Sequence, residues 1–132
     1  MPSLLADLAA HCRAGDAAPF ELGKMDCSLF AADWVRLQTG VDLAASWRGT
    51  YSTRREYLRL LSADGGLVRV VARAMHHIKA PQIPPADAQP GDIGIIVTED
   101  GPALAVRGQA AWMAKTGDQL SSTPHASFAW RL

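Results

Sequence analysis

The sequence predicts an α+β domain in which a helical first half packs against a small antiparallel sheet from the second half. Apolar residues recur at helical spacing as far as about residue 77. From Gly91 onward, short apolar runs alternate with glycine-containing turns, as in a series of strands. Helices followed by strands are typical of the α+β class. At 132 residues the chain has the size of one domain, so we expect 1–132 to fold as a single unit.

The first two predicted helices have clear end signals. Ser3 can cap a helix that we expect to end at Gly15. The second helix is expected to begin with Asp26 as its N-cap and Cys27 in its first turn, and to end at Gly40. Apolar residues cover much of its circumference, which predicts a central, buried position. The apolar stripe of the first helix contains Leu4, Leu5, Leu8 and Cys12.

A third helix is indicated by Thr53 and Glu56, which have the spacing of a capping box. We expect it to end at Gly65-Gly66. Residues 67–77 allow a helix or a strand, and the apolar spacing favours the helix, so that 1–80 is mainly helical. The residues of the third helix that we expect to point inward are Tyr57, Leu58 and Leu61.

Arginines gather around the start of this third helix. Arg48, Arg54, Arg55 and Arg59 form a basic cluster that Glu56 interrupts. Because aromatic side chains for base stacking do not accompany it, we interpret the cluster as a solvated helix face and not as a phosphate-binding patch.

Prolines in 81–92 predict a stiff linker that crosses the surface, followed by the sheet in 93–132. Glu99-Asp100-Gly101 predicts a turn between the first two strands. Gly108 and Gly117 separate the later strands. The strands are expected at 93–97, 103–106, 110–114 and 128–130.

Composition excludes several classes of function. Lys+Arg and Asp+Glu balance at 13 each, so no overall field attracts nucleic acid or an anionic membrane. We expect no membrane span, because no apolar run approaches the roughly 18 residues needed. The N-terminus lacks a signal-peptide pattern, which predicts synthesis in the cytoplasm. Cys12 and Cys27 are too few for a disulfide framework and lack zinc-ligand spacing, so neither a metal nor a cofactor is expected.

Cys27 is the candidate reactive residue. Backbone N–H groups and the dipole at a helix start stabilise a thiolate and lower the thiol pKa. Asp26 caps the helix, but its charge opposes thiolate formation. The alternative is a structural cysteine in an apolar helix, which is also our interpretation of Cys12.

A wider pattern of residues spans nearly the whole chain. Its members are Phe20, Gly23, Asp26-Cys27, Phe30, Ala32-Asp33, Val35, Gly40, Arg48-Gly49, Tyr51, Gly65-Gly66 and Pro90-Gly91-Asp92. This pattern resembles the NlpC-type cell-wall peptidases, a papain-like superfamily, and is most similar to the small NlpC-like proteins encoded among tail genes of bacteriophages and gene-transfer agents. The resemblance implies helices packed on a small antiparallel sheet, with a nucleophilic Cys27 on the helix and a histidine on the sheet. It implies a peptide bond in the stem of peptidoglycan as substrate.

The sequence departs from this family where the general base belongs. The family's histidine stands at the start of the second sheet strand, but 101–106 contains none, and the third polar position falls in the apolar run 110–112. Without a base, Cys27 loses the roughly 10²–10⁴-fold that proton transfer contributes. His125, near the last strand, is the candidate substitute. The other histidines are His11, His76 and His77.

Through the resemblance, we expect a bacteriophage tail-tip component, located in the virion tail, that keeps the fold and has lost catalysis. Its partners would be other tail-tip or hub proteins, with no nucleic acid. The alternative is an active peptidoglycan peptidase with Cys27 as nucleophile and His125 as base. A third hypothesis is an immunity or toxin-related domain on the same fold. Trp47, Trp112 and Trp130 are either interface anchors or core residues.

Overall fold

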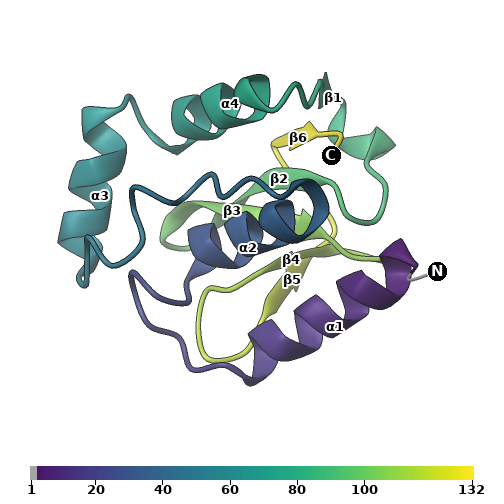
Figure 1. Cartoon of the computed structure of the whole chain (residues 1–132), viewed down its shortest axis with the longest axis horizontal. Coiled ribbons are helices and arrows are strands. Elements are labelled where there is room, and N and C mark those ends of the chain that lie inside the picture. The colour runs from purple at the N-terminus through teal and green to yellow at the C-terminus, as the bar shows by residue number, and fades with distance from the viewer. Residues whose placement is uncertain (1–2) are drawn as a thin grey trace.

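The structure is a computed structural model that describes residues 3–132 (Figure 1). It confirms the α+β class. Within the described residues, four α-helices precede a six-stranded antiparallel sheet. The helices are α1 (Leu4–Ala17), α2 (Cys27–Thr39), α3 (Arg54–Ala63) and α4 (Leu67–His77), and a short 3₁₀ helix spans Pro85–Asp87. The strands are β1 (Gln82–Ile83), β2 (Ile93–Thr98), β3 (Gly101–Arg107), β4 (Trp112–Ala114), β5 (Ser121–Thr123) and β6 (Phe128–Trp130).

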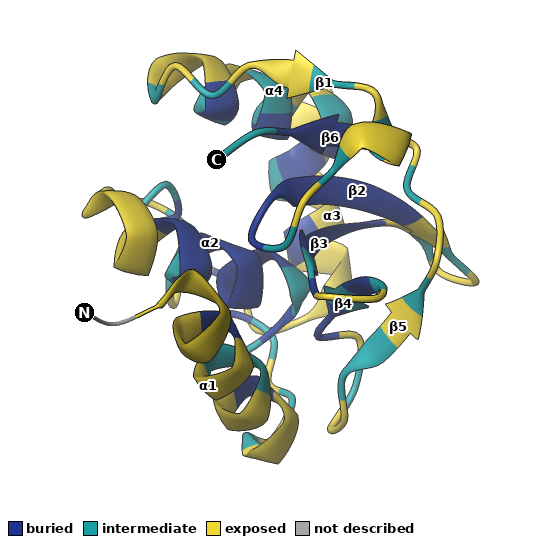
Figure 2. Ribbon diagram, turned by 90° about the vertical axis from the view of Figure 1, so that its right-hand side faces the viewer, coloured by how far each residue is buried: buried dark blue, intermediate teal, exposed yellow. Residues whose placement is uncertain are grey.

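The sheet has the strand order β1-β6-β2-β3-β4-β5. Strands β2 to β5 form a meander, while β6 returns from the C-terminal end to pair with β2, opposite Ile93 and Ile95. The central pair aligns Ile93 with Val106 and Ile95 with Leu104. Helix α2 lies against β3, and Figure 2 shows that both elements are largely buried.

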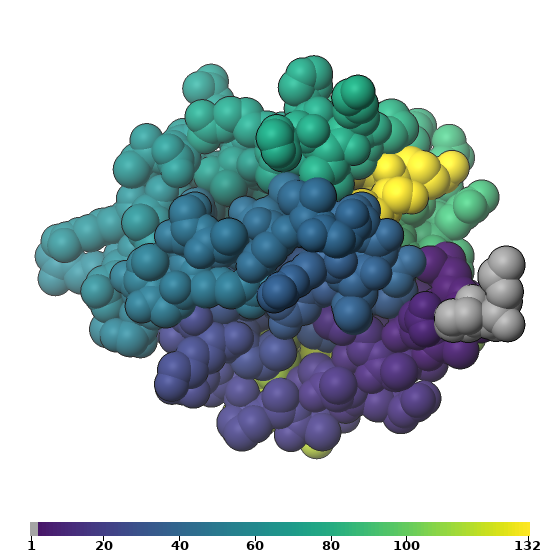
Figure 3. Space-filling view, in the orientation of Figure 1, coloured from purple at the N-terminus to yellow at the C-terminus, as the bar shows by residue number. Residues whose placement is uncertain are grey.

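Trp34 joins the core of α2 to the start of the sheet. Its side chain is fully buried, and its Nε1 donates to the carbonyl oxygen of Gly91 at 2.8 Å. The chain between α2 and α3 crosses the front of the molecule, between α4 and α1 (Figure 3). Within residues 3–132, no helix is both long and apolar enough to cross a bilayer.

The predicted ends of α2 and α3 are confirmed. Asp26 caps α2, and Gly40 ends it in the left-handed conformation with φ of +79°. The capping box is also present, because the Thr53 hydroxyl accepts from the Glu56 backbone N–H at 3.2 Å and donates to the Glu56 carboxylate at 3.1 Å. Residues 67–77 are helical, as their apolar spacing favoured.

Gly15 does not end α1, which continues to Ala17. The glycine is buried inside the helix because α2 packs closely there. A Cβ at this position would lie 2.5 Å from the Phe30 ring. The prediction was wrong because the glycine serves a close contact between helices and not a turn.

The segment 81–92 is not a simple linker. Gln82 and Ile83 form β1, which pairs with β6, and a 3₁₀ helix follows. Strand β5 was not predicted either, since Ser121–Thr123 has no apolar alternation. Leu58, expected to point inward, is 44% exposed. Tyr57 and Leu61, also expected to point inward, are buried in the core, at 9% and 6% exposed.

Candidate functional site

The start of α2 is organised around the buried carboxylate of Asp26, which is 1% exposed. Its Oδ1 accepts from the backbone N–H of Leu29 at 2.9 Å. Its Oδ2 accepts from the backbone N–H of Gly23 at 3.0 Å and from the Tyr51 hydroxyl at 2.6 Å. Three donors therefore compensate the removal of this charge from water.

Gly23 allows the chain before α2 to lie directly on the 49–51 segment. Its φ is +85°, and a Cβ there would lie 2.0 Å from the backbone oxygen of Tyr51. The Gly23 carbonyl accepts from the N–H of Gly49 at 3.0 Å. Any side chain at Gly23 would both strain the backbone and displace Tyr51 from Asp26.

Cys27 is the first residue of α2 and is partly buried. Its thiol lies beside the hydroxyls of Ser28 and Tyr57, which hydrogen-bond each other at 2.8 Å, and beside the backbone of Leu104 in β3. On the sheet side the cysteine packs against a cluster rich in small apolar residues: Ile96, Ala103, Ala105, Trp112, Ala114 and Ala129.

These surroundings raise the pKa of the Cys27 thiol above its ordinary value. Burial is the main cause, and the charge of Asp26 raises the pKa further. Hydrogen bonds from the Leu104 backbone, Tyr57 and Ser28 act in the opposite direction but do not reverse the shift. The expected lowering at a helix start is therefore corrected, because desolvation and the neighbouring carboxylate outweigh the dipole. The thiol is protonated at neutral pH.

The cavity beside Cys27 has a volume of about 430 Å³ and lies between α3, the start of α2 and the β2–β3 hairpin. Within residues 3–132, no histidine lines it. Its walls combine apolar side chains with hydroxyl, cationic and carboxylate groups. They are Phe20, Leu22, Asp26, Cys27, Arg54, Tyr57, Leu58, Leu61, Ser62, Gly66, Leu67, Thr98, Asp100, Pro102, Ala103, Lys115 and Thr116.

The structure does not bring His125 to this cavity. His125 is exposed in the connection between β5 and β6. His11 lies on α1, where its Nε2 is 2.9 Å from the Phe30 carbonyl oxygen and its ring stacks on that of Phe30. His76 and His77 occupy the last turn of α4 and are exposed.

Lys115 is a cavity residue that sequence reasoning missed. It is 0% exposed, and its Nζ donates to the backbone oxygens of Ala18 and Asp118. The ammonium group thus ties the end of α1 to the turn before β5. A lysine directly after a strand ordinarily indicates a solvated turn, so the sequence carried no signal for this role.

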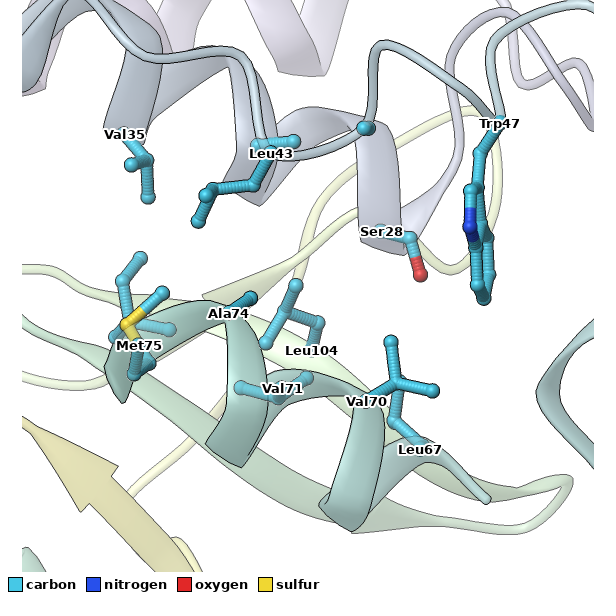
Figure 4. A pocket seen from close by; sticks show the side chains of 13 residues that line it. Ser28, Val35, Leu43, Trp47, Leu67, Val70, Val71, Ala74, Met75 and Leu104 are labelled. Atoms are coloured by element: carbon cyan, nitrogen blue, oxygen red, sulfur yellow. The ribbon is translucent and has the colours of Figure 1, made fainter. Parts of the chain in front are cut away.

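A second, apolar cavity of about 80 Å³ lies on the other side of Ser28 (Figure 4). Leu43 and Trp47 face Val70 and Met75 of α4 across it, and the Ser28 hydroxyl lies at one end. The sequence offered Trp47, Trp112 and Trp130 either as interface anchors or as core residues. Trp47 lines this apolar cavity. Trp112 and Trp130 are core residues, 1% and 3% exposed respectively.

Among residues 3–132, no three His, Cys, Asp or Glu side chains form a cluster that could hold a metal ion. No curated protein matches the chain. A family model described as a domain of unknown function (DUF6950) matches residues 2–132, a range that covers all the helices and strands, Cys27 and the hydrogen-bonded start of α2. The protein belongs to the DUF6950 family.

Proposed function

We propose that this protein is a non-catalytic component of a bacteriophage tail tip, built on an NlpC-like, papain-like fold whose peptidase chemistry has been lost. The observation that carries the loss of catalysis is the state of Cys27. Its thiol has a raised pKa, and the cavity around it contains no histidine among the residues that the structure describes.

Cysteine peptidases need a thiolate to attack the carbonyl and an imidazole to move the proton. The resemblance implies that the imidazole would stand near the beginning of β3. Pro102 and Ala103 occupy this stretch and line the cavity. Acyl transfer by Cys27 requires both a thiolate and a nearby general base. The thiol is protonated and apolar side chains stand where the base would be, so both are missing.

Lys115 does not replace the missing base. Its Nζ donates to the backbone oxygens of Ala18 and Asp118, and the side chain is fully buried, so its hydrogen bonds are directed away from Cys27. The cation thus has a structural role, holding the loop that leads toward α2 against the sheet.

The tail-tip assignment is supported by the resemblance to NlpC-like proteins of tail gene clusters. The structure adds a physical argument for a scaffold. The buried Asp26 network fixes the start of α2 through three hydrogen bonds, which is the role that a scaffold needs from it. The expected partners are neighbouring tail-tip and hub proteins in the virion tail.

Hydrolysis is tested by incubating the purified protein with peptidoglycan sacculi beside the variants Cys27→Ala and Cys12→Ala. We expect no release of stem-peptide fragments by any of the three. Release that is lost only in Cys27→Ala would show an active peptidase and refute the loss of catalysis.

Assembly is tested separately by co-expressing the chain with the tail-tip and hub proteins encoded beside it. We expect a stable complex that survives gel filtration and is unchanged by Cys27→Ala. A chain that remains alone in this experiment would contradict the tail-tip assignment, whatever the peptidoglycan assay shows.

A further inference from the structure

The exposed face of α3 carries an unusual set of side chains. Arg55, Leu58, Arg59 and Ser62 are spaced by three and four residues, so they form one stripe along the helix. Together with Arg54 and Ala63 they line a shallow surface hollow on α3 that is largely open to solvent. Helix α3 lies at one edge of the molecule (Figure 1), where a partner can approach this face.

The arginines of this stripe lack acidic partners. Within residues 3–132, no ion pair involves Arg55 or Arg59. Arg54, at the edge of the hollow, lies 3.9 Å from the exposed carboxylate of Asp100 and donates to its backbone oxygen at 2.5 Å. Glu56, the acidic residue of α3, accepts from Thr53 and from the backbone N–H of Ser52 at the helix start.

This arrangement opposes the stability of the helix. Arg54 and Arg55 lie in the first turn, where the helix dipole disfavours positive charge. Arg55 and Arg59 are like charges one turn apart, which also repel. Glu56, the acid of the first turn, is engaged at the helix start, so it does not neutralise the Arg55–Arg59 stripe, and this uncompensated charge indicates a face suited to binding.

The chemistry of the stripe identifies its occupant. Arginine forms bidentate pairs with carboxylates and is enriched at protein interfaces. Leu58, 44% exposed between the arginines, provides an apolar contact at the centre. Stacking aromatics, which single-stranded nucleic acid requires, are absent from the residues of the hollow. Three arginines are also fewer than the about four to eight cations of a lipid-binding cluster.

We propose that the exposed face of α3 binds an acidic segment of a partner protein. An apolar side chain of that segment packs on Leu58, and carboxylates on either side of it pair with Arg55 and Arg59. This inference uses the charges and exposure of α3 alone, so it holds whether or not the partner belongs to a phage tail.

The test uses a fluorescein-labelled probe peptide with a central leucine between glutamates, followed by fluorescence anisotropy. We expect saturable binding that weakens as salt is raised from about 50 to 300 mM, because exposed ion pairs are screened. The double variant R55E/R59E should bind the probe at least about tenfold more weakly, since both attractive pairs become repulsive. L58S should lose about threefold, because it removes apolar contact.

The control is R13E/R69E, which makes the same change of net charge at two exposed arginines, one on α1 and one on α4. It should bind the probe within about twofold of the unchanged protein. R55E/R59E should melt at about the same temperature as the unchanged protein, because both side chains are exposed and glutamate at position 55 suits the first turn. An unchanged melting temperature excludes misfolding as the cause of weaker binding.

Three results would overturn the proposal. The first is an equal loss of probe affinity in R55E/R59E and in R13E/R69E, which would indicate an effect of net charge alone. The second is equal binding of a probe in which glutamine replaces glutamate. The third is no binding of the acidic probe while a single-stranded oligonucleotide or anionic vesicles bind through Arg55 and Arg59.

Discussion

Tyr51→Phe removes one hydroxyl from the network that holds the start of α2. The Tyr51 hydroxyl donates to the Asp26 carboxylate at 2.6 Å, and the two residues are only 3% and 1% exposed. Water therefore cannot replace the lost donor, and Asp26 keeps only its two backbone donors. Hydrogen bonds to charged groups contribute about 1.5–3 kcal/mol, so we expect a loss of about 2 kcal/mol.

Tyr57→Phe is the matched control, because it deletes the same atom from a neighbouring ring. The Tyr57 hydroxyl bonds the neutral Ser28 hydroxyl at 2.8 Å, and the two tyrosine rings lie 5.2 Å apart. A neutral hydrogen bond contributes about 0.5–1.5 kcal/mol. We therefore expect about 1 kcal/mol for this variant, half the cost of Tyr51→Phe.

Urea unfolding measures the free energy lost in each variant, and thermal unfolding measures the change in Tm. For a chain of this length, about 1 kcal/mol corresponds to about 3–5 °C in Tm, so Tyr51→Phe should melt about 8 °C lower. The denaturant dependence m should stay constant, since the surface exposed on unfolding is unchanged. Equal losses in the two variants would refute the claim that a buried charge makes the Tyr51 bond the stronger one.

Three further predictions concern single positions. Gly23→Ala should lower the free energy of unfolding in urea by at least about 3 kcal/mol, because the new Cβ would lie 2.0 Å from a backbone oxygen. Gly40→Ala is the control, since Gly40 has a similar φ but open space around it, and it should cost only about 1 kcal/mol. Equal costs in the two variants would exclude the clash. Lys115→Met should cost about 2 kcal/mol in urea unfolding, because the carbonyl oxygens of Ala18 and Asp118 lose the donor that ties them together. Exposed Lys24→Met should cost less than about 0.5 kcal/mol, and unchanged stability of Lys115→Met would refute the structural role of Lys115. In a Cys12→Ala variant, the rate at which iodoacetamide alkylates Cys27 should reach half its maximum only above about pH 8.5. A half-maximal rate near pH 6 would instead show an activated thiol. The pKa of Cys27 is higher in the folded protein than in the unfolded chain, where it is about 8.5. The contribution of the protonated thiol to the free energy of unfolding is therefore fully present below about pH 8.5 and is lost as pH rises through the folded pKa.

The helix ends were predictable because their signals are local. Asp26 bonds a backbone N–H three residues on, and Thr53 and Glu56 satisfy each other within one turn. Such bonds form whatever packs around the helix. Gly15 shows the limit of local signals, since its role depends on Phe30 from another helix.

The short strands could not be predicted for a related reason. Gln82 and Ile83 are a strand only because β6 returns from the far end of the chain to pair with them. Two-residue pairing has no periodicity of its own. Leu58 is exposed for a similar reason, because the position of α3 at the edge of the molecule decides which of its apolar residues become covered.

The sequence alone determined the α+β class, the helix caps and the position of Cys27 at the first turn of α2, because each depends on residues close together in the chain. Tertiary structure decided the chemistry at that position. It brought the alanines of the sheet to the thiol, left His125 in an exposed loop, and buried Lys115 against the distant carbonyl of Ala18. Protonation depends on the solvent and charges within a few ångströms of a group, and folding assembles that environment from remote segments.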